Sequence, residues 1–171
     1  MDTPKRIFSA VALAFAVLAL VIGVMGVPHT AQARPQANID VADGEVDVAD
    51  NGQCSLVEAI VNANNDAQTY ADCAGGNGAD TIVLPAGSVF SLDNPDPTDV
   101  TNLYTGLPVI SSTITIQTDG AGATIQRSAT ATDNFRLFYV NLAGSLTLNN
   151  ITLEPISKPA LEVKCRHDEN H

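Results

Sequence analysis

A succession of short strand-like segments between residues 79 and 153 constrains the fold most strongly. These segments are rich in Ile, Val and Thr, and Gly, Asn or Asp turns separate them. They are ADTIVL (79–84), SVFSL (88–92), VISSTITIQ (109–117), ATIQR (123–127), FRLFYV (135–140) and SLTLNNITL (145–153). Apolar and polar residues alternate in them, as in strands that pack one face on a core. The pattern predicts an all-β fold.

Two arrangements accommodate many short strands, an antiparallel sandwich and a parallel β-helix. Four successive strands have their centres at Ile116, Ile125, Phe138 and Leu148, in steps of about 9 to 13 residues. Two strand-to-strand steps therefore make about 22 to 23 residues, within the range of solenoid repeats. Sandwiches have similar strand spacings, so the spacing alone does not decide between the two arrangements.

One helix is predicted before these strands, in CSLVEAIVNANN (54–65). Ser55 and Glu58 fit a capping box, in which each side chain accepts the other residue's backbone N–H. The apolar residues that follow lie on one helical face; they are Leu56, Ala59, Ile60 and Ala63. We expect Asn64-Asn65 to end the helix in the left-handed conformation. A helix this short is marginal in water, so its apolar face must be packed against other elements.

Residues 1–33 resemble a secretory signal peptide. Lys5 and Arg6 precede a long apolar run (7–27), and the triplet Ala31-Gln32-Ala33 follows it. This order predicts cleavage before Arg34 and a secreted or cell-surface protein. The alternative is a retained membrane anchor, because an apolar run of this length can just span a bilayer.

The charge of the chain limits its partners. Between Pro35 and Leu153 there are 14 acidic residues and only two basic ones, Arg127 and Arg136. Nucleic acids and anionic membrane surfaces both require positive charge, so we expect neither as a partner once the signal peptide is cleaved. We expect a monomer that its own charge keeps soluble outside the cell.

The chain has three cysteines. In an exported protein Cys54 and Cys73 are the natural disulfide pair, enclosing the polar loop 55–72. Closing a loop of that length stabilises the fold by about 3 kcal/mol in the chain-entropy model. Cys165 is left without a partner.

The acidic segment 34–53 has two interpretations. In the first it is extended and solvated, and only its valines touch the core. In the second it begins a calcium loop, since Asp47, Asn51, Gly52 and Glu58 match an EF-hand template. Ala49 occupies a position of that template where a ligand is required. We therefore expect no cofactor, and keep Asp47, Asn51 and Glu58 as calcium candidates.

Several blocks of the chain resemble the N-terminal region of secreted bacterial right-handed parallel β-helix proteins with a CSLREA-type motif, in the pectate-lyase-like solenoid superfamily. The matching blocks, in the family's order, are CSLVEAI (54–60), ANN (63–65), Cys73, ADTIVLPAG (79–87), GLPVI (106–110), ITI (114–116), GATI (122–125), FRLF (135–138) and GSLTL (144–148). Together they cover roughly residues 38–153. Val57 departs from the motif, which has arginine there.

The resemblance implies that residues 54–153 form the start of a right-handed parallel β-helix, with about two to three coils. The first coil of such a solenoid exposes apolar side chains and unpaired strand edges, so it needs a cap. The helix from Leu56 to Ala63 is suited to cover it, and the Cys54–Cys73 bond would hold it in place. We interpret this helix as a structural plug and not as an active site.

Residues with catalytic chemistry are scarce. No His occurs between Arg34 and Leu153, which removes the basis for a His-dependent triad or a His-rich metal site. Glycoside hydrolysis requires two carboxylates that face one groove, and the candidates are Asp80, Asp119 and Asp133, each beside a turn. Pectate-lyase-like β-helices, which the expected fold resembles, use acidic calcium ligands and an arginine base. Here Arg136 is better explained as the partner of a carboxylate or as a surface residue, so we expect no catalytic residue.

The residues after Leu153 do not resemble another coil. The segment EPISKPALEVKCRHDENH (154–171) is rich in charge and contains two prolines, as in an irregular or truncation-derived tail. The leading functional hypothesis is a non-catalytic, adhesin-like or carbohydrate-binding module, whose partner is a carbohydrate or a cell-surface molecule. One alternative is the N-terminal fragment of a polysaccharide lyase or hydrolase whose catalytic coils lie beyond this chain. Another is a non-functional truncated gene product.

Overall fold

The computed structural model describes residues 36–96 and 104–154. The predicted signal peptide (1–33), with its cleavage site, lies outside the described residues. The predicted tail lies outside them too, except for Glu154, and so do Cys165 and the two His of the tail.

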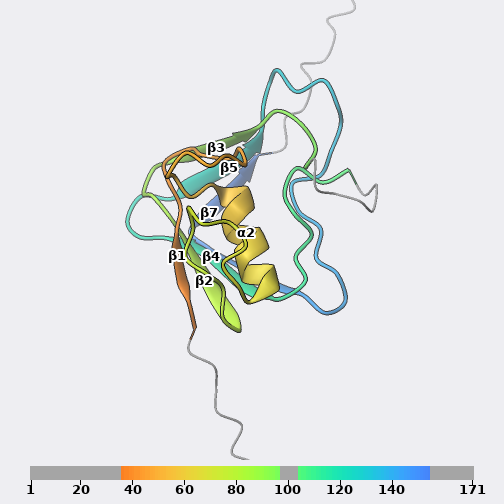
Figure 1. Cartoon of the computed structure of the whole chain (residues 1–171). Helices are drawn as coiled ribbons and strands as arrows, with labels where there is room; N and C mark the ends of the chain where they lie inside the picture. Colours follow the sequence, from red (N-terminus) through yellow and green to blue (C-terminus); the bar gives the residue numbers. More distant parts are fainter. Residues whose placement is uncertain (1–35, 97–103, 155–171) are drawn as a thin grey trace, which may run out of the picture. The chain divides into compact units, whose positions relative to one another are not determined.

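The described strands form two parallel sheets (Figure 1). The first has the order β1 (Asn38–Asp40), β2 (Ala79–Leu84), β4 (Thr113–Thr118), β6 (Ser145–Asn149). The second has the order β3 (Val89–Leu92), β5 (Ala123–Arg127), β7 (Ile151–Glu154). From β2 onwards successive strands alternate between the two sheets. The described part is thus mostly strand and loop with one helix, and the parallel pairing rules out an antiparallel sandwich there.

The repeat length differs from the value that the strand spacing predicted. Ile116 in β4 is paired with Leu148 in β6, so one repeat runs from position 116 to position 148. All three strand-to-strand steps between these positions make one repeat, and the expectation that two steps make a repeat was wrong. The reason is that the chain passes a third segment between the second sheet and its return to the first.

This third segment is not the regular strand expected at FRLFYV (135–140). It is joined to residues 105–110 only by two isolated parallel bridges, Thr105↔Arg136 and Ile110↔Val140. The Gly106 N–H donates to the Arg136 carbonyl at 2.7 Å. The next donor along such a ladder is residue 108, a proline, which has no N–H. Pro108 therefore interrupts the pairing, and no strand forms on either side of it.

Left-handed residues mark the corners between the two sheets. Gly87 (φ 77°) lies between β2 and β3, Gly120 (φ 87°) between β4 and β5, and Asn150 (φ 60°) between β6 and β7. The segment SLTLNNITL, expected as one strand, is therefore divided at Asn150, and its halves belong to different sheets. The Asn150 side-chain amide donates to the Gly120 carbonyl at 2.9 Å, which joins two successive corners.

The core lies between the sheets and consists of side chains at equivalent registers. Ile82, Ile116 and Leu148 are in one row across the first sheet, and the first two are fully buried. Phe90 and Ile125 are in a row of the second sheet and are also fully buried. Each such side chain contributes about 1.5–3 kcal/mol of hydrophobic stabilisation. Burial decreases towards the last strands, since Leu148 is only half-buried and Leu153 is exposed.

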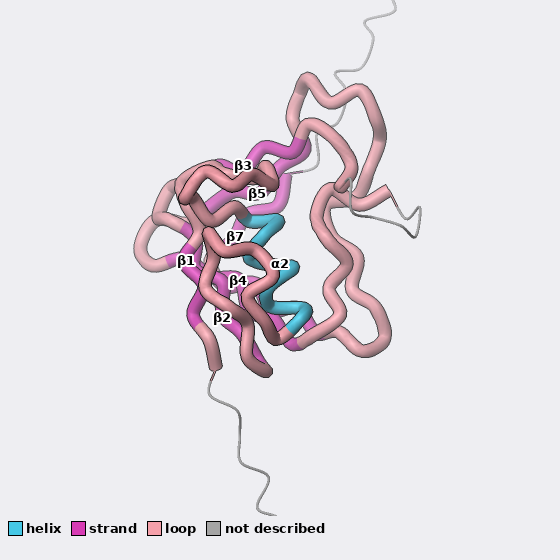
Figure 2. Tube along the Cα trace, viewed as in Figure 1, coloured by secondary structure: helices cyan, strands magenta, loops and turns pink. Residues whose placement is uncertain are grey.

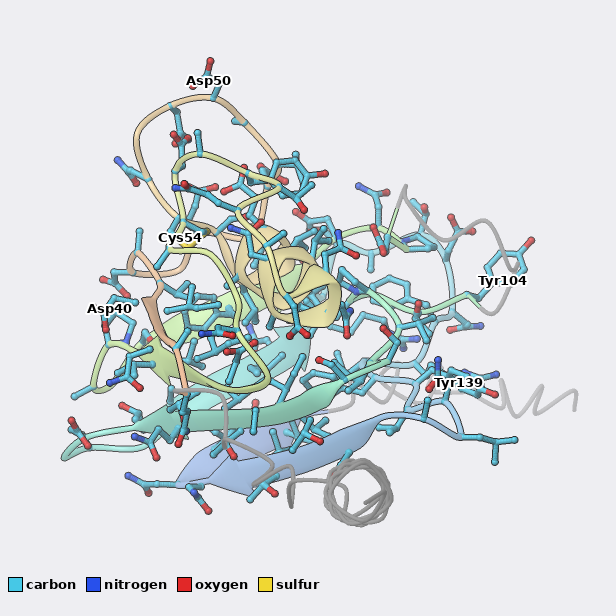
Figure 3. All side chains as sticks on the ribbon, turned by 60° about the horizontal axis from the view of Figure 1, so that its bottom comes forward. Asp40, Asp50, Cys54, Tyr104 and Tyr139 are labelled. Atoms are coloured by element: carbon cyan, nitrogen blue, oxygen red, sulfur yellow. A yellow bond between two sulfur atoms is a disulfide. The ribbon has the colours of Figure 1, made fainter. Side chains whose placement is uncertain are left out.

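The single helix of the described part, α2 (Leu56–Asn65), contacts β2 and β4 and lies across the end of the stacked strands (Figure 3). Loop segments surround the rest of it (Figure 2). The helix ends one residue later than expected. Asp66, and neither Asn64 nor Asn65, adopts the left-handed conformation, with φ 49°, and its N–H bonds to carbonyls of the last turn.

Candidate functional site

Cys54 and Cys73 form a disulfide, the pair that the sequence predicts, with Cα atoms 4.6 Å apart. Both side chains are buried. Cys54 directly precedes the N-cap residue of α2, and Cys73 lies in the loop that follows the helix. The bond therefore fixes the start of α2 to the loop that returns along it.

The expected capping box is present at the start of α2. The Glu58 N–H donates to the Ser55 hydroxyl at 3.2 Å, and the Ser55 N–H donates to Glu58 Oε2 at 3.0 Å. The second carboxylate oxygen, Oε1, accepts the N–H of Ala49 at 3.1 Å. Glu58 is only 1% exposed, and both of its side-chain oxygens accept backbone N–H groups, as a buried polar group requires. The same side chain thus caps the helix and ties the preceding acidic loop to it.

The predicted apolar face of α2 is fully buried. Its residues are Leu56, Ala59, Ile60 and Ala63, each 0% exposed. Val57, at the position where the motif that the sequence resembles has arginine, is also buried, at 5% exposed. An apolar side chain at this position avoids the cost of burying a charge.

Two asparagines of α2 fix the helix to its surroundings. The sequence predicted no role for Asn62, and for Asn64 only a part in ending the helix. The fully buried Asn62 amide donates to the carbonyls of Tyr70, Cys73 and Ala74, and Asn62 Oδ1 accepts the Tyr70 N–H. Asn64 donates to the Val109 carbonyl at 2.8 Å and accepts the Ser111 N–H at 2.8 Å. The only signal in the sequence was a polar residue at a position next to the apolar stripe.

Two of the calcium candidates, Glu58 and Asn51, have side-chain oxygens that accept backbone N–H groups. Both oxygens of Glu58 accept backbone N–H groups, as described above. Asn51 Oδ1 accepts the Gln53 N–H at 2.8 Å, whereas Asp47 takes part through its backbone N–H, which donates to Glu45 Oε1 at 3.2 Å. Among residues 36–96 and 104–154, no three His, Cys, Asp or Glu side chains are arranged to hold a metal ion.

The three carboxylate candidates lie in different environments. Asp80 is in β2 and is 1% exposed, whereas Asp119 and Asp133 are exposed residues of the turns after β4 and β5. Burial raises the pKa of Asp80 above its ordinary value of 3.8 and outweighs the hydrogen bonds that it accepts from the N–H groups of Asn77 and Ala37. The second oxygen of Asp80 has no hydrogen-bond partner in the described part of the structure.

From the sequence, Arg136 is explained either as the partner of a carboxylate or as a surface residue. Within the described residues it has no carboxylate partner, and it lies at the surface. It is exposed, and its guanidinium lies over the ring of Tyr139, 5.9 Å from the ring centroid. Among residues 36–96 and 104–154, the ring of Tyr139 is the contact that the structure gives for this guanidinium. Arg127 is placed differently, over the Phe135 ring at 5.8 Å and with a hydrogen bond to Asn134.

Tyr104 lies on the neighbouring segment. The Arg136 N–H donates to the Tyr104 carbonyl at 3.0 Å, which holds the two segments side by side. The Tyr104 side chain is 61% exposed, and its backbone adopts a left-handed φ of 49°, which is unusual for an aromatic residue. Figure 3 shows Tyr104 and Tyr139 on the same side of the described part, both pointing away from the strands. We call Tyr104, Arg136 and Tyr139 the tyrosine–arginine surface.

Packing below this surface determines which side chains point outward. Phe135 is buried against Gly106, where a Cβ atom would come within 2.6 Å of the Phe135 ring. A side chain at position 106 would therefore displace Phe135. With Phe135 anchored inward, its neighbour Arg136 is directed outward, as alternate residues of an extended segment are.

A pocket of about 450 Å³ lies next to the same segment and is partly lined by Gly106. Its lining includes three carboxylates and three apolar residues, Asp47, Asp93, Asp96, Val46, Val57 and Leu92. Hydrogen bonds from Ser128 and Thr130 lower the pKa of Asp93, so this carboxylate is ionised at neutral pH. Ionised carboxylates accept hydrogen bonds and donate none, so the pocket suits a ligand with hydroxyl or amine donors.

Comparisons with known proteins add no assignment, because no family model, no curated protein and no solved structure matches the chain. Within the residues that the structure describes, no helix is long and apolar enough to cross a membrane.

Proposed function

We propose that the described residues are the capped start of a right-handed parallel β-helix of two to three coils. The support is the order in which the chain passes from the first sheet to the second, then to the bridged segment, and back to the first. The in-register row of Ile82, Ile116 and Leu148 is typical of stacked coils. Helix α2 is then the plug over the first coil.

On this proposal the protein is an exported, secreted or cell-surface module. The support is the signal-peptide pattern of residues 1–33, the acidic composition and the buried disulfide. Disulfides persist in oxidising compartments, which agrees with export.

The module is non-catalytic and binds carbohydrate through the tyrosine–arginine surface, in the manner of an adhesin. The single observation that carries this proposal is the guanidinium of Arg136, stacked on Tyr139 and without a polar partner in the described part, beside the exposed ring of Tyr104. Tyrosine rings provide rigid apolar faces with a polar tip at low entropic cost. Arginine adds several hydrogen-bond donors in a fixed geometry, and the carboxylates of the neighbouring pocket add acceptors.

The test is binding of the purified full chain to a panel of neutral and acidic oligosaccharides. Variants Tyr104→Ala, Tyr139→Ala and Arg136→Gln each remove one component of the surface. We expect each to weaken binding by about tenfold or more, as truncation of an aromatic or arginine hot spot does. Tyr70→Ala is the matched control, because Tyr70 is a tyrosine of the loop that follows α2.

Three outcomes separate the hypotheses. If the wild-type chain binds no oligosaccharide, the proposed ligand class is wrong. If it binds and the three variants bind equally well, the proposed surface is wrong. If the oligosaccharide is cleaved and not only bound, the lyase or hydrolase hypothesis is the better one.

A further inference from the structure

Two Asn-Gly dipeptides of the chain share one structural feature. The Gly52 N–H, which follows Asn51, donates to Asp72 Oδ2 at 3.0 Å. The Gly78 N–H, which follows Asn77, donates to Asp66 Oδ1 at 2.7 Å. These are the only Asn-Gly pairs in the sequence, and in both the glycine amide is bonded to a carboxylate.

Asn-Gly is the dipeptide in which asparagine is most open to attack by the following backbone nitrogen, because glycine has no side chain to hinder the approach. The glycine nitrogen forms a bond to the asparagine Cγ, and the side-chain nitrogen leaves as ammonia with the proton that the glycine nitrogen loses. Water then opens the resulting five-membered imide at one of its two carbonyls. The products are aspartate or isoaspartate, and no other reactant is needed.

We propose that Asp72 and Asp66 keep these two asparagines unreactive in the folded protein, so that Asn51 and Asn77 are deamidation sites that open only when the loops around α2 detach. The glycine nitrogen becomes a nucleophile as its proton is lost. A carboxylate that accepts this N–H stabilises the protonated amide, and its negative charge opposes the build-up of charge on the nitrogen.

Both protecting carboxylates belong to the loop that packs around α2. Asp72 precedes Cys73 and also accepts the Asn51 N–H at 2.9 Å, so it binds two successive amides of the preceding acidic loop. Asp66 is the C-cap residue of α2. Loss of the helix or of its loops therefore removes both hydrogen bonds at once. Deamidation then adds a negative charge, and isoaspartate adds a backbone carbon, where the loops must meet.

The experiment incubates the purified full chain at mildly alkaline pH and follows deamidation at each site by peptide mass spectrometry. Asp72→Ala is expected to accelerate deamidation of Asn51 by about tenfold, the factor that corresponds to one charge-assisted hydrogen bond, and to leave Asn77 unchanged. Asp66→Ala is expected to do the reverse. Asp50→Ala is the matched control. Asp50 lies at the tip of the same acidic loop, and its side chain points away from the rest of the described part (Figure 3).

The reduced, urea-unfolded chain gives the unprotected rate at both sites. If the folded wild type reacts at that rate, the protection does not exist. If Asp72→Ala reaches the unprotected rate at both sites, the variant has lost its fold. Asp72→Asn then tests whether the charge of Asp72 protects Asn51. Its neutral side chain can still accept the N–H, so we expect a rate at Asn51 between those of the folded wild type and the unfolded chain. A rate equal to that of the folded wild type would overturn the role of the charge.

Discussion

At the scale of single residues, buried polar groups determine how the parts of this protein fit together. Asn62 is fully buried. Its side-chain nitrogen lies within hydrogen-bond distance of three carbonyls of the loop after α2, and its Oδ1 accepts one N–H of that loop. Asp80 is buried as well, but within the described residues only one of its oxygens has hydrogen-bond donors, the N–H groups of Ala37 and Asn77. The polar atoms of Asn62 all have hydrogen-bond partners, whereas one oxygen of Asp80 has none in the described part. Substitutions at the two positions should therefore have different effects on stability.

Asn62→Ala should lower the free energy of unfolding by roughly 3–5 kcal/mol, because it leaves several buried backbone groups without partners. Chemical denaturation followed by circular dichroism measures this change. The control is Asn65→Ala, at the exposed end of the same helix, for which a change of about 0.5 kcal/mol or less is expected. Equal losses in the two variants would contradict the role assigned to Asn62.

Asp80 should make stability depend on pH. Because its pKa is raised, the folded protein holds this proton more tightly than the unfolded chain does. The stabilisation from Asp80 is therefore fully present below its ordinary pKa of 3.8 and is lost as the pH rises through the raised pKa. Asp80→Asn removes the titration. The stability of the wild type relative to Asp80→Asn should thus decrease from acidic to neutral pH in parallel denaturation series, and an increase would show that the pKa shift has the opposite sign.

At the scale of elements, the start of α2 combines a capping box, a buried carboxylate and a disulfide within one short stretch, Cys54 to Glu58. A helix this short has little stability of its own, so these contacts and its buried face hold it in place. The ends of the strands are likewise determined by local features, the left-handed residues at the corners between the sheets. The corner at Asn150 divides one alternating segment between two sheets, and the neighbouring corner residues are glycines.

Ser55→Ala removes the hydroxyl that accepts the Glu58 N–H at the start of α2 and should cost about 1–2 kcal/mol of stability. A thermal melt of the variant, with the disulfide intact, tests this. Ser145→Ala, at an exposed position at the start of β6, is the control. If the two variants melt at the same temperature, the capping box does not stabilise the fold.

At the scale of the whole described unit, the disulfide joins the start of α2 to the loop that follows it, on the side where the helix contacts β2 and β4. The opposite end is less well buried, since β6 and β7 are the last described strands of their sheets and contain half-buried or exposed apolar residues. Stability should therefore depend strongly on the covered end, where the fully buried side chains are concentrated.

Replacing Cys54 by Ser should lower stability by about 3 kcal/mol under oxidising conditions, because the unfolded chain regains the entropy of an open loop. The loop spans a sequence separation of 19. Thermal melts with and without reductant test this: reductant should lower the midpoint of the wild type and leave that of Cys54→Ser unchanged. Cys165→Ser, which keeps the bond between Cys54 and Cys73, serves as the control. A midpoint in Cys54→Ser equal to that of the oxidised wild type would refute the idea of a pinned plug.

The sequence by itself determined the local features of this protein: the strand-rich segments, the capping box of Ser55 and Glu58, the apolar face of α2 and the pairing of Cys54 with Cys73. Each of these depends on residues close in the chain or on residue type alone. Propensity also predicted a strand at residues 135–140, where only two isolated bridges form, and one strand across 145–153, which the turn at Asn150 divides into β6 and β7.

Only the tertiary structure decided the direction of strand pairing, the length of the repeat between β4 and β6, the partners of Asn62 and the stacking of Arg136 on Tyr139. These features join residues that are distant in the chain or depend on how a segment is anchored. An alternating strand can pair in parallel or antiparallel with similar local energy, so the choice depends on the packing of the whole core and on the backbone donors that the neighbouring segments offer. Pro108 offers no backbone donor to the segment that contains Arg136, and the two segments are joined there by two isolated bridges and not by a regular ladder.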